Sequence, residues 1–476
     1  MSLVEKELPN GWTMAKIHQI VSYPKQDIVD GPFGSNLKAS EYVNEGIPII
    51  RLQNVERNEF VNKNIKFVTK EKANQLKRHS FVSNDIVITK LGIPVGKACI
   101  VPNFLPNGII VADILRIHLN QKHISIKFLM YLINSQKIIS QFASQTRGTT
   151  RPRVNLTKFR DFVFPLPPLN EQKKIVAKIE ELFSLVDSAK DTLEKTLVLL
   201  KQYRQSILKH AFEGKLVPQD PNDEPSSVLL EKIKKENPDK KFSDIAMEKQ
   251  LPKGWIWISL FETISKIKRG PSLKCNRDGK GIRYITSGNL REGKLVLELD
   301  YKFLSGFDKI EQCKLNNNDL ILNCVNSIEM IGKSAVFYKK YGDAIVGFNN
   351  YGLELKNFLN PEFANYFFQS SIAKNQIYFL IKRAVNQVSF ATNELKRINV
   401  SLPPLNEQKR IVAKIEESFS LIEKNEILIE QLLLQYSKIK NSILKQAFEG
   451  KLVPQDPNDE PAEVLLQRIR EEKNGK

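Results

Sequence analysis

The sequence has few cysteines and no long apolar run. Its 4 cysteines, Cys99, Cys275, Cys313 and Cys324, are scattered over 476 residues without a Cys-x-x-Cys pair. This spacing favours reduced structural thiols in a cytoplasmic protein over disulfides or a zinc site. No run of about 18 apolar residues occurs, and residues 1–10 lack the apolar core of a secretion signal, so we expect neither a membrane span nor secretion.

Motifs of common catalytic and cofactor sites are also missing. Gly332-Lys333-Ser334 looks like the end of a phosphate-binding loop, but Ser327 stands where that loop needs its first glycine. We find no Asn/Asp-Pro-Pro-aromatic element, with which a methyltransferase holds a flipped adenine. The 5 histidines show no metal-ligand spacing, and no Ser-His-Asp set can be assigned. We therefore predict no catalytic centre, no metal and no cofactor.

Positive charge is abundant, and it is concentrated in two segments. The net charge is +19. Residues 1–169 hold 23 Lys and Arg against 12 Asp and Glu, residues 250–400 hold 22 against 13, and the remaining residues hold 27 against 28. A generally basic proteome would explain the total but not this segregation. The pattern indicates a polyanionic partner, most simply nucleic acid.

An internal repeat is the strongest signal in the sequence. Leu-Pro-Pro-Leu-Asn-Glu-Gln begins at Leu166 and again at Leu402, and Ala-Phe-Glu-Gly-Lys-Leu-Val-Pro-Gln-Asp-Pro-Asn-Asp-Glu-Pro begins at Ala211 and again at Ala447. Both pairs are 236 residues apart (402 − 166 and 447 − 211), so the element between the two motifs keeps its length and register.

The repeated element has the pattern of a long helix. Apolar residues recur at steps of mostly four and three, as at Ile175, Ile179 and Leu182. Gly214 and Gly450 are stop signals. About 40 helical residues make a rod of roughly 60 Å. Because such a helix cannot bury its stripe alone, we expect the two copies to pack antiparallel as a spacer.

The regions before the two helices share a layout. Each opens with Leu-Pro-x-Gly-Trp, carries a Gly-Pro loop and an Asn-Asp before an apolar run, then has a Gly-Lys and an aromatic-rich helical stretch. Between these anchors the residues diverge. Short strands with turn signals and flanking helices predict α+β domains.

The expected architecture is two such domains and two helices related by a pseudo-twofold repeat. The predicted boundaries are residues 1–169 for the first domain, 170–217 for the first helix, 218–249 for a linker, 250–400 for the second domain, 401–453 for the second helix and 454–476 for a C-terminal tail.

This arrangement resembles the specificity subunit of Type I restriction-modification systems. The resemblance covers essentially the whole chain, and its specific part is the two helices with Ala-Phe-Glu-Gly-Lys-Leu-Val-Pro-Gln at their ends. It implies that each domain is a target recognition domain reading one half of a split double-stranded DNA sequence. It also implies that the helices set the gap and dock two adenine-N6 methyltransferase subunits, which bind S-adenosylmethionine. Motor-nuclease subunits would complete the restriction enzyme.

Candidate DNA-contacting residues are cations and amides in loops, often beside glycine, because arginine and lysine suit guanine while asparagine and glutamine suit adenine. In the first domain they are Gly31, Pro32, Phe33, Gly34, Ser35, Lys38, Arg51, Gln53, Asn54, Lys90, Lys97, Arg147, Thr149, Thr150, Arg151 and Arg153. In the second they are Lys268, Arg269, Lys274, Arg283, Asn289, Arg291, Lys333, Asn349, Asn350, Arg383, Asn386 and Gln387.

Two other classes of protein remain as alternatives at this point. One is a self-contained DNA methyltransferase or nuclease, which a methyl-transfer assay on the lone chain would reveal. The other is a coiled-coil scaffold or RNA-binding adaptor, which a DNA footprint with two protected half-sites would exclude.

Overall fold

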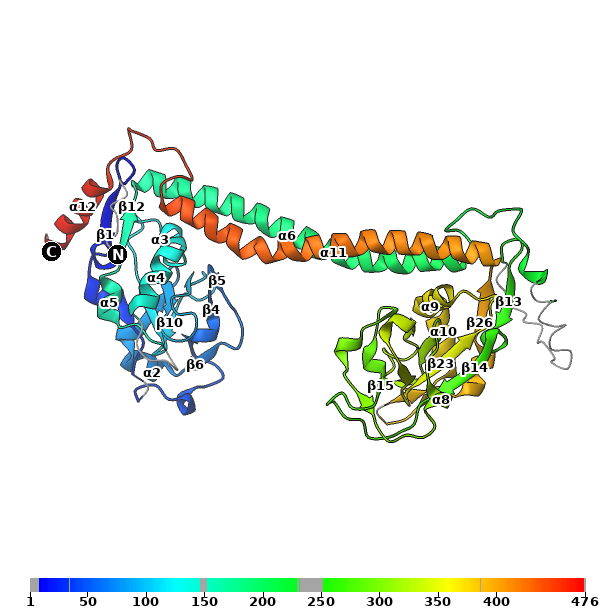
Figure 1. Cartoon of the computed structure of the whole chain (residues 1–476). Coiled ribbons are helices and arrows are strands. Elements are labelled where there is room, and N and C mark those ends of the chain that lie inside the picture. The colour runs from blue at the N-terminus through cyan, green and yellow to red at the C-terminus, as the bar shows by residue number, and fades with distance from the viewer. Residues whose placement is uncertain are drawn as a thin grey trace. The chain divides into compact units, whose positions relative to one another are not determined.

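The computed structural model describes residues 8–33, 35–145, 152–228, 231, 251–385 and 387–474. The chain divides into two units (Figure 1). The first comprises residues 1–193 and 431–476, and the second comprises residues 194–430. Each unit holds one globular domain and a part of each of two long helices, α6 (Leu169–Phe212) and α11 (Leu405–Phe448).

The first globular domain contains two four-stranded sheets, ordered β6-β3-β10-β7 and β2-β11-β8-β9, and the antiparallel pair β1–β12. Its strands and helices are β1 Thr13–Lys16, α1 Pro24–Asp27, β2 Ile28–Asp30, β3 Ile47–Ile50, β4 Val55–Glu56, β5 Glu59–Phe60, β6 Lys66–Val68, α2 Lys70–Gln75, β7 Ser80–Val82, β8 Ile86–Thr89, β9 Ala98–Ile100, β10 Asn107–Ile110, β11 Ile114–Ile117, α3 Ile126–Ile133, α4 Gln136–Gln145, α5 Leu156–Arg160 and β12 Val163–Leu166.

The core of this domain follows the two-residue period of its strands. Ile86 and Ile88 of β8 pack in the cluster that contains Phe128 of α3, whereas Val87 faces Phe81 and Ile110 of the other sheet. Both faces of β8 are therefore covered, which is why the strand reads as a continuous apolar run.

The second globular domain repeats this layout. Sheet β14-β23-β19-β21 lies between helix α9 and sheet β18-β15-β22, and smaller sheets complete the domain. Its elements are β13 Ile256–Ser259, β14 Ile264–Arg269, β15 Ile282–Ile285, β16 Leu290–Arg291, β17 Lys294–Leu295, β18 Phe303–Leu304, α8 Ile310–Cys313, β19 Leu320–Asn323, β20 Val325–Asn326, β21 Ser334–Val336, β22 Ala344–Val346, β23 Asn350–Leu355, α9 Pro361–Gln369, α10 Ser371–Leu380, β24 Lys382–Arg383, β25 Val388–Ser389 and β26 Asn399–Leu402.

The two long helices pack against each other antiparallel, as Figure 1 shows for each unit. In the first unit, Lys440 Nζ of α11 lies 2.6 Å from Asp187 of α6. In the second unit, Arg204 Nη2 of α6 lies 2.9 Å from Glu426 of α11. The predicted combination of α+β domains and packed long helices is confirmed.

The Glu-Gln of the repeated motif fastens the start of each helix to the domain before it. Glu171 accepts a hydrogen bond of 2.9 Å from the indole of Trp12, and Glu407 accepts one of 3.0 Å from Trp255. The next residue, Gln172 or Gln408, is fully buried and bonds backbone groups of its domain.

The C-terminal end of α11 packs on the first domain, and the C-terminal end of α6 packs on the second domain. In the first unit, the ring of Phe448 lies 5.5 Å from that of Phe128, and in the second unit Phe212 lies 5.0 Å from Phe363. The same set of contacts therefore occurs in both units, which explains why both ends of the repeated element keep their sequence.

Helix α12 (Ala462–Asn474) folds the C-terminal segment onto the first domain. Leu465, Leu466 and Ile469 are buried in the core cluster that contains Ile17. Ala462 N–H donates to the carbonyl of Gly11 at 2.9 Å. The segment that the sequence presents as a tail is thus a packed helix. None of the described helices is long and apolar enough to cross a membrane.

Candidate nucleic-acid interface

A cleft opens in the first domain where two parallel strands end together. β3 and β10 are its parallel pair, and their carboxyl ends lead into residues 51–53 and 111–113. The volume of the cleft is about 390 Å³. It is lined by Pro32, Leu37, Tyr42, Arg51, Leu52, Gln53, Val111, Ala112 and Asp113. Carboxyl ends of parallel strands are a common place for ligand sites.

The second domain has a cleft at the corresponding place. β15 and β22 are its parallel pair, and they lead into residues 286–288 and 347–349. This cleft has a volume of about 520 Å³. It is lined by Ser272, Leu273, Cys275, Tyr284, Thr286, Ser287, Gly288, Asp300, Lys302, Gly347, Phe348 and Asn349. The two clefts therefore share a backbone frame and differ in side chains.

The Gly-Pro loops form one wall of each cleft, and their glycines are needed there. A Cβ on Gly31 would lie 2.0 Å from the carbonyl oxygen of Val111, and one on Gly270 would lie 1.8 Å from that of Val346. Any side chain would push the loop away from the strand end. The repeated Gly-Pro is thus explained by close backbone packing.

Polar side chains of the first domain gather around its cleft. Arg51 and Gln53 line it, and Arg153 forms an ion pair of 2.6 Å with the lining residue Asp113. The Phe33 side chain is 78% exposed on the loop beside it. Ser35 and Lys38 are exposed on the loop that follows Phe33. Lys97 is not a lining residue of the cleft, and its ammonium group pairs with Glu56 at 2.6 Å.

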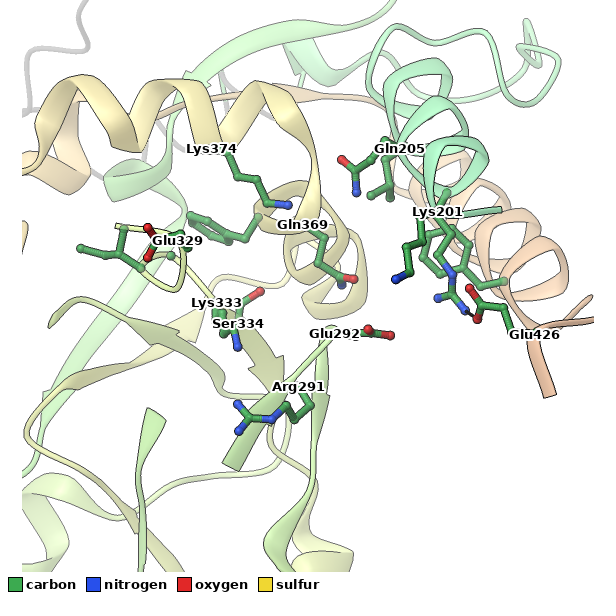
Figure 2. Close-up of a pocket in the computed structure, with 17 residues that line it drawn as sticks. Lys201, Gln205, Arg291, Glu292, Glu329, Lys333, Ser334, Gln369, Lys374 and Glu426 are labelled. Atoms are coloured by element: carbon green, nitrogen blue, oxygen red, sulfur yellow. Dashed lines mark hydrogen bonds and ion pairs between the residues drawn. The ribbon is translucent and has the colours of Figure 1, made fainter. Parts of the chain in front are cut away.

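In the second domain the predicted residues divide into separate places. Asn349 lines the cleft, and the guanidinium of Arg269 stacks 4.8 Å from the ring of Phe348. Lys274 lies exposed just beyond the lining residue Leu273. Other predicted residues lie away from this cleft. Arg283 stacks on Tyr301 and Phe303, Arg383 stacks on Tyr378, and Gln387 lies in the β24–β25 turn. Arg291 and Lys333 line a different cleft (Figure 2).

Five predicted residues have side chains that are buried and engaged inside the protein. Asn54, Asn289 and Asn350 donate hydrogen bonds to backbone carbonyls, Lys90 pairs with Asp30 at 2.6 Å, and Lys268, 1% exposed, pairs with Asp319 at 2.6 Å. Their polar groups are already satisfied, so we remove them from the set of candidate DNA contacts. Gly34, Arg147, Thr149, Thr150, Arg151 and Asn386 lie outside the described residues.

Tyr284 ties the walls of the second cleft together. Its hydroxyl donates to the carbonyl of Pro271 at 2.8 Å and accepts from the N–H of Phe348 at 2.7 Å. Burial raises the pKa of Tyr284, and it also raises the pKa of Cys275 nearby. Both groups are therefore neutral at physiological pH. No cluster of metal-ligating side chains occurs among the residues that the structure describes.

Several lining residues escaped the sequence analysis, among them Tyr42, Asp113, Tyr284, Asp300 and Phe348. Carboxylates, and most aromatic rings, lie outside the pattern of loop cations, amides and glycines from which the candidates were predicted. The signal that could have found them is position: each domain has two apolar runs that form parallel strands, and the residues after both runs meet.

Comparison with known proteins decides which family this frame belongs to. A family model described as the Type I restriction modification DNA specificity domain matches residues 9–197 and again residues 247–442. The chain belongs to this family. It is a DNA specificity subunit of a Type I restriction-modification system, a non-catalytic member of the complex, as predicted from the repeated helices.

Relatives of this specificity subunit match along nearly its whole length. It is 26% identical to the Type I restriction enzyme EcoKI specificity subunit of Escherichia coli K12, over 98% of this chain and 96% of the relative. It is 24% identical to the StySPI specificity subunit of Salmonella potsdam, with the same coverage. The crystal structure of an HsdS subunit from Thermoanaerobacter tengcongensis matches with a TM-score of 0.61 at 19% identity, covering 94% of this chain and 99% of that one, which shows a shared fold.

Proposed function

We propose that each globular domain of this specificity subunit reads one half of a two-part DNA target with the rim of its cleft. The observation that carries this proposal is the pair of clefts at corresponding places with unlike lining. Base edges are distinguished by their pattern of donors and acceptors. A shared frame with different side chains is therefore what two readers of different half-sites require.

The proposed contact set is the predicted one without the five residues whose side chains are engaged inside the protein. In the first domain it comprises Gly31, Pro32, Phe33, Ser35, Lys38, Arg51, Gln53, Lys97 and Arg153, together with Gly34, Arg147, Thr149, Thr150 and Arg151, which lie outside the described residues. In the second it comprises Arg269, Lys274 and Asn349 at the cleft, and Arg283, Arg291, Lys333, Arg383 and Gln387 as contacts away from it. Asn386 also belongs to the set and lies outside the described residues.

The experiment changes one amide in each cleft and maps methylated adenines in cells carrying the chain and its methyltransferase. We expect Gln53→Ala to relax one half of the methylated motif and Asn349→Ala to relax the other, at a cost of about 1–3 kcal/mol for each lost base contact. Asn375→Ala, an exposed amide on α10, is the control. Variants that leave both halves intact, or disturb both alike, would refute the assignment.

We propose further that α6 and α11 set the length of DNA between the half-sites. Each is one uninterrupted helix of 44 residues, about 66 Å at 1.5 Å per residue. Their lateral packing in each unit supports this, because a paired helix resists bending more than a single one.

The same helices are the proposed docking surface for two adenine-N6 methyltransferase subunits, which bind S-adenosylmethionine, within a cytoplasmic complex that motor-nuclease subunits complete. Large apolar side chains remain exposed along them, which is typical of protein interfaces. They are Leu185, Val198, Leu199, Tyr203, Leu421, Ile427, Leu428, Leu432, Leu434 and Ile439. Leu434→Lys, at a side chain 75% exposed, should weaken assembly in size-exclusion chromatography without lowering the melting temperature of the lone chain. Unchanged assembly would exclude this surface at Leu434.

A further inference from the structure

Another cleft lies inside the second unit, between helix α6 and the globular domain (Figure 2). Its volume is about 440 Å³, within the range of small-ligand sites. Residues 291–293, 329 and 331–334 form one side, α6 with Phe419 and Glu426 of α11 forms the other, and Gln369 and Lys374 close it. It shares no lining residue with the cleft proposed to read DNA.

The lining of this α6 cleft carries an excess of positive charge. Its cations are Lys201, Arg204, Arg291, Lys333 and Lys374, and its carboxylates are Glu292, Glu329 and Glu426. Arg204 is neutralised by its ion pair with Glu426. Four cations then face two carboxylates.

Lys333 is half-buried in the cleft, whereas Lys374 is exposed at its rim. Burial lowers the pKa of Lys374. Burial, and then the charge of Arg291, lower the pKa of Lys333, and the carboxylate of Glu292 opposes them in part. Within the described part of the chain, neither ammonium group has an ion-pair partner. An anion in the cleft would favour the charged form of half-buried Lys333 and would also attract exposed Lys374.

The donors converge from separate elements. Figure 2 shows Lys374 of α10 and Lys201 and Gln205 of α6 directed into the same gap, with Gln369 between them. Several donors around one gap suit an anion with several acceptor oxygens better than a single carboxylate.

We propose that the α6 cleft binds a phosphate group, held by Lys201, Lys333 and Lys374. The phosphate has two conceivable sources, a free phosphate-bearing molecule or the backbone of bound DNA. The first source does not require DNA reading by the other cleft, but it would assign Lys333, a proposed DNA contact, to the phosphate instead. The second would add a sequence-independent contact to it.

The experiment uses the full chain in a buffer free of phosphate and sulfate, with inorganic pyrophosphate as the probe in titration calorimetry. The test variant is Lys201→Gln with Lys374→Gln. The control is Lys195→Gln with Lys209→Gln, which removes two charges from exposed positions of α6 outside the cleft. Melting curves of both variants verify that they fold.

We expect saturable binding of pyrophosphate to the wild type and the control, and binding at least about tenfold weaker in the test variant, because each lost charged hydrogen bond alone is enough for that factor. A second arm measures binding of duplexes with unrelated sequences across a salt series. If the source is DNA, the test variant alone weakens binding to all duplexes and lowers the salt slope by about 2. If the source is a free molecule, DNA binding matches that of the control, and pyrophosphate still binds in the presence of DNA.

The proposal is overturned if pyrophosphate binds the wild type and the test variant alike, or binds neither while DNA binding is equal in both double variants. An effect of the test variant only on assembly with a protein partner would also overturn it. Failure of the half-site mapping described above would leave the pyrophosphate arm untouched, so the two proposals can fail separately.

Discussion

Two buried carboxylates, Glu171 and Glu407, stand at the joints between domains and helices. Each accepts an indole N–H, and burial raises the pKa of each. A carboxyl group whose pKa is raised by folding stabilises the folded state most below its unfolded pKa, and this contribution is lost as the pH rises through the folded pKa. The joints are therefore tighter in mild acid than at neutral pH.

Glu171→Gln should remove this dependence while keeping an acceptor for Trp12. Relative to the variant, the wild type should lose stability as the pH is raised from about 4 to 7, the range above the ordinary pKa of glutamate. Melting temperatures over that range measure it. Glu181→Gln changes an exposed carboxylate on the same helix and should show no such trend. A parallel response of the wild type and Glu171→Gln would contradict the assignment.

At Gly214, just after the end of α6, both the backbone conformation and the close packing of a neighbour favour glycine. Its φ is +66°, and a Cβ would lie 2.3 Å from Pro252 Cγ. Gly306 has the same φ of +66° with nothing within 4 Å. Both glycines are therefore favoured by the backbone, but only the first is also required by packing.

Gly214→Ala should lower the free energy of unfolding by about 2–3 kcal/mol, and Gly306→Ala by only about 1 kcal/mol, the cost of the left-handed backbone alone. Urea denaturation of the two variants gives the difference. Equal losses would mean that Pro252 moves aside freely and that the joint is not tightly packed.

Some residues predicted as DNA contacts are buried against partners that lie far away in the sequence. Lys268 lies in Ile-Ser-Lys-Ile-Lys-Arg, where alternation gives no warning that its side chain faces inward. Asp319, its partner, is 51 residues away. The loops beside the clefts could be predicted from glycine and proline, but the ion pair that neutralises a cation such as Lys268 depends on the three-dimensional fold.

At the scale of elements, the long helices were the most predictable feature. The predicted first helix, residues 170–217, is observed as Leu169–Phe212, and the predicted second, residues 401–453, as Leu405–Phe448. The differences have a local cause: Pro403 and Pro404 precede the second helix, and Gly214 and Gly450 turn the chain before residues that dock on a domain. The repeated sequence continues past the end of each helix into the segment that packs on a domain, so the repeat alone does not show where the helix ends.

Helix α12 is an element that composition did not reveal, and its packing is testable. Leu465 is 3% exposed in the core of the first unit, whereas its neighbour Val464 is 40% exposed. Leu465→Glu should cost about 3 kcal/mol or more because it buries a charge without a partner. Val464→Glu should change stability by less than about 0.5 kcal/mol. Equal behaviour of the two variants in thermal unfolding would mean that α12 is not docked in solution.

At the scale of the whole molecule, the account depends on a division of labour. In the proposed function, two domains with a common arrangement of strands and different clefts would read DNA, and the two long helices would set the distance between the half-sites. Position 193 of α6 and position 430 of α11 mark where the chain divides into units, so both helices can be lengthened there without touching either domain.

The most direct measurement inserts one helical heptad into both helices at these positions and maps methylated adenines in cells that carry the methyltransferase. Seven residues add about 10 Å, which corresponds to about three base pairs of DNA. The account predicts a methylated motif with both halves unchanged and a gap longer by about three base pairs. A motif with its original gap, or methylation at targets of many different spacings, would contradict it.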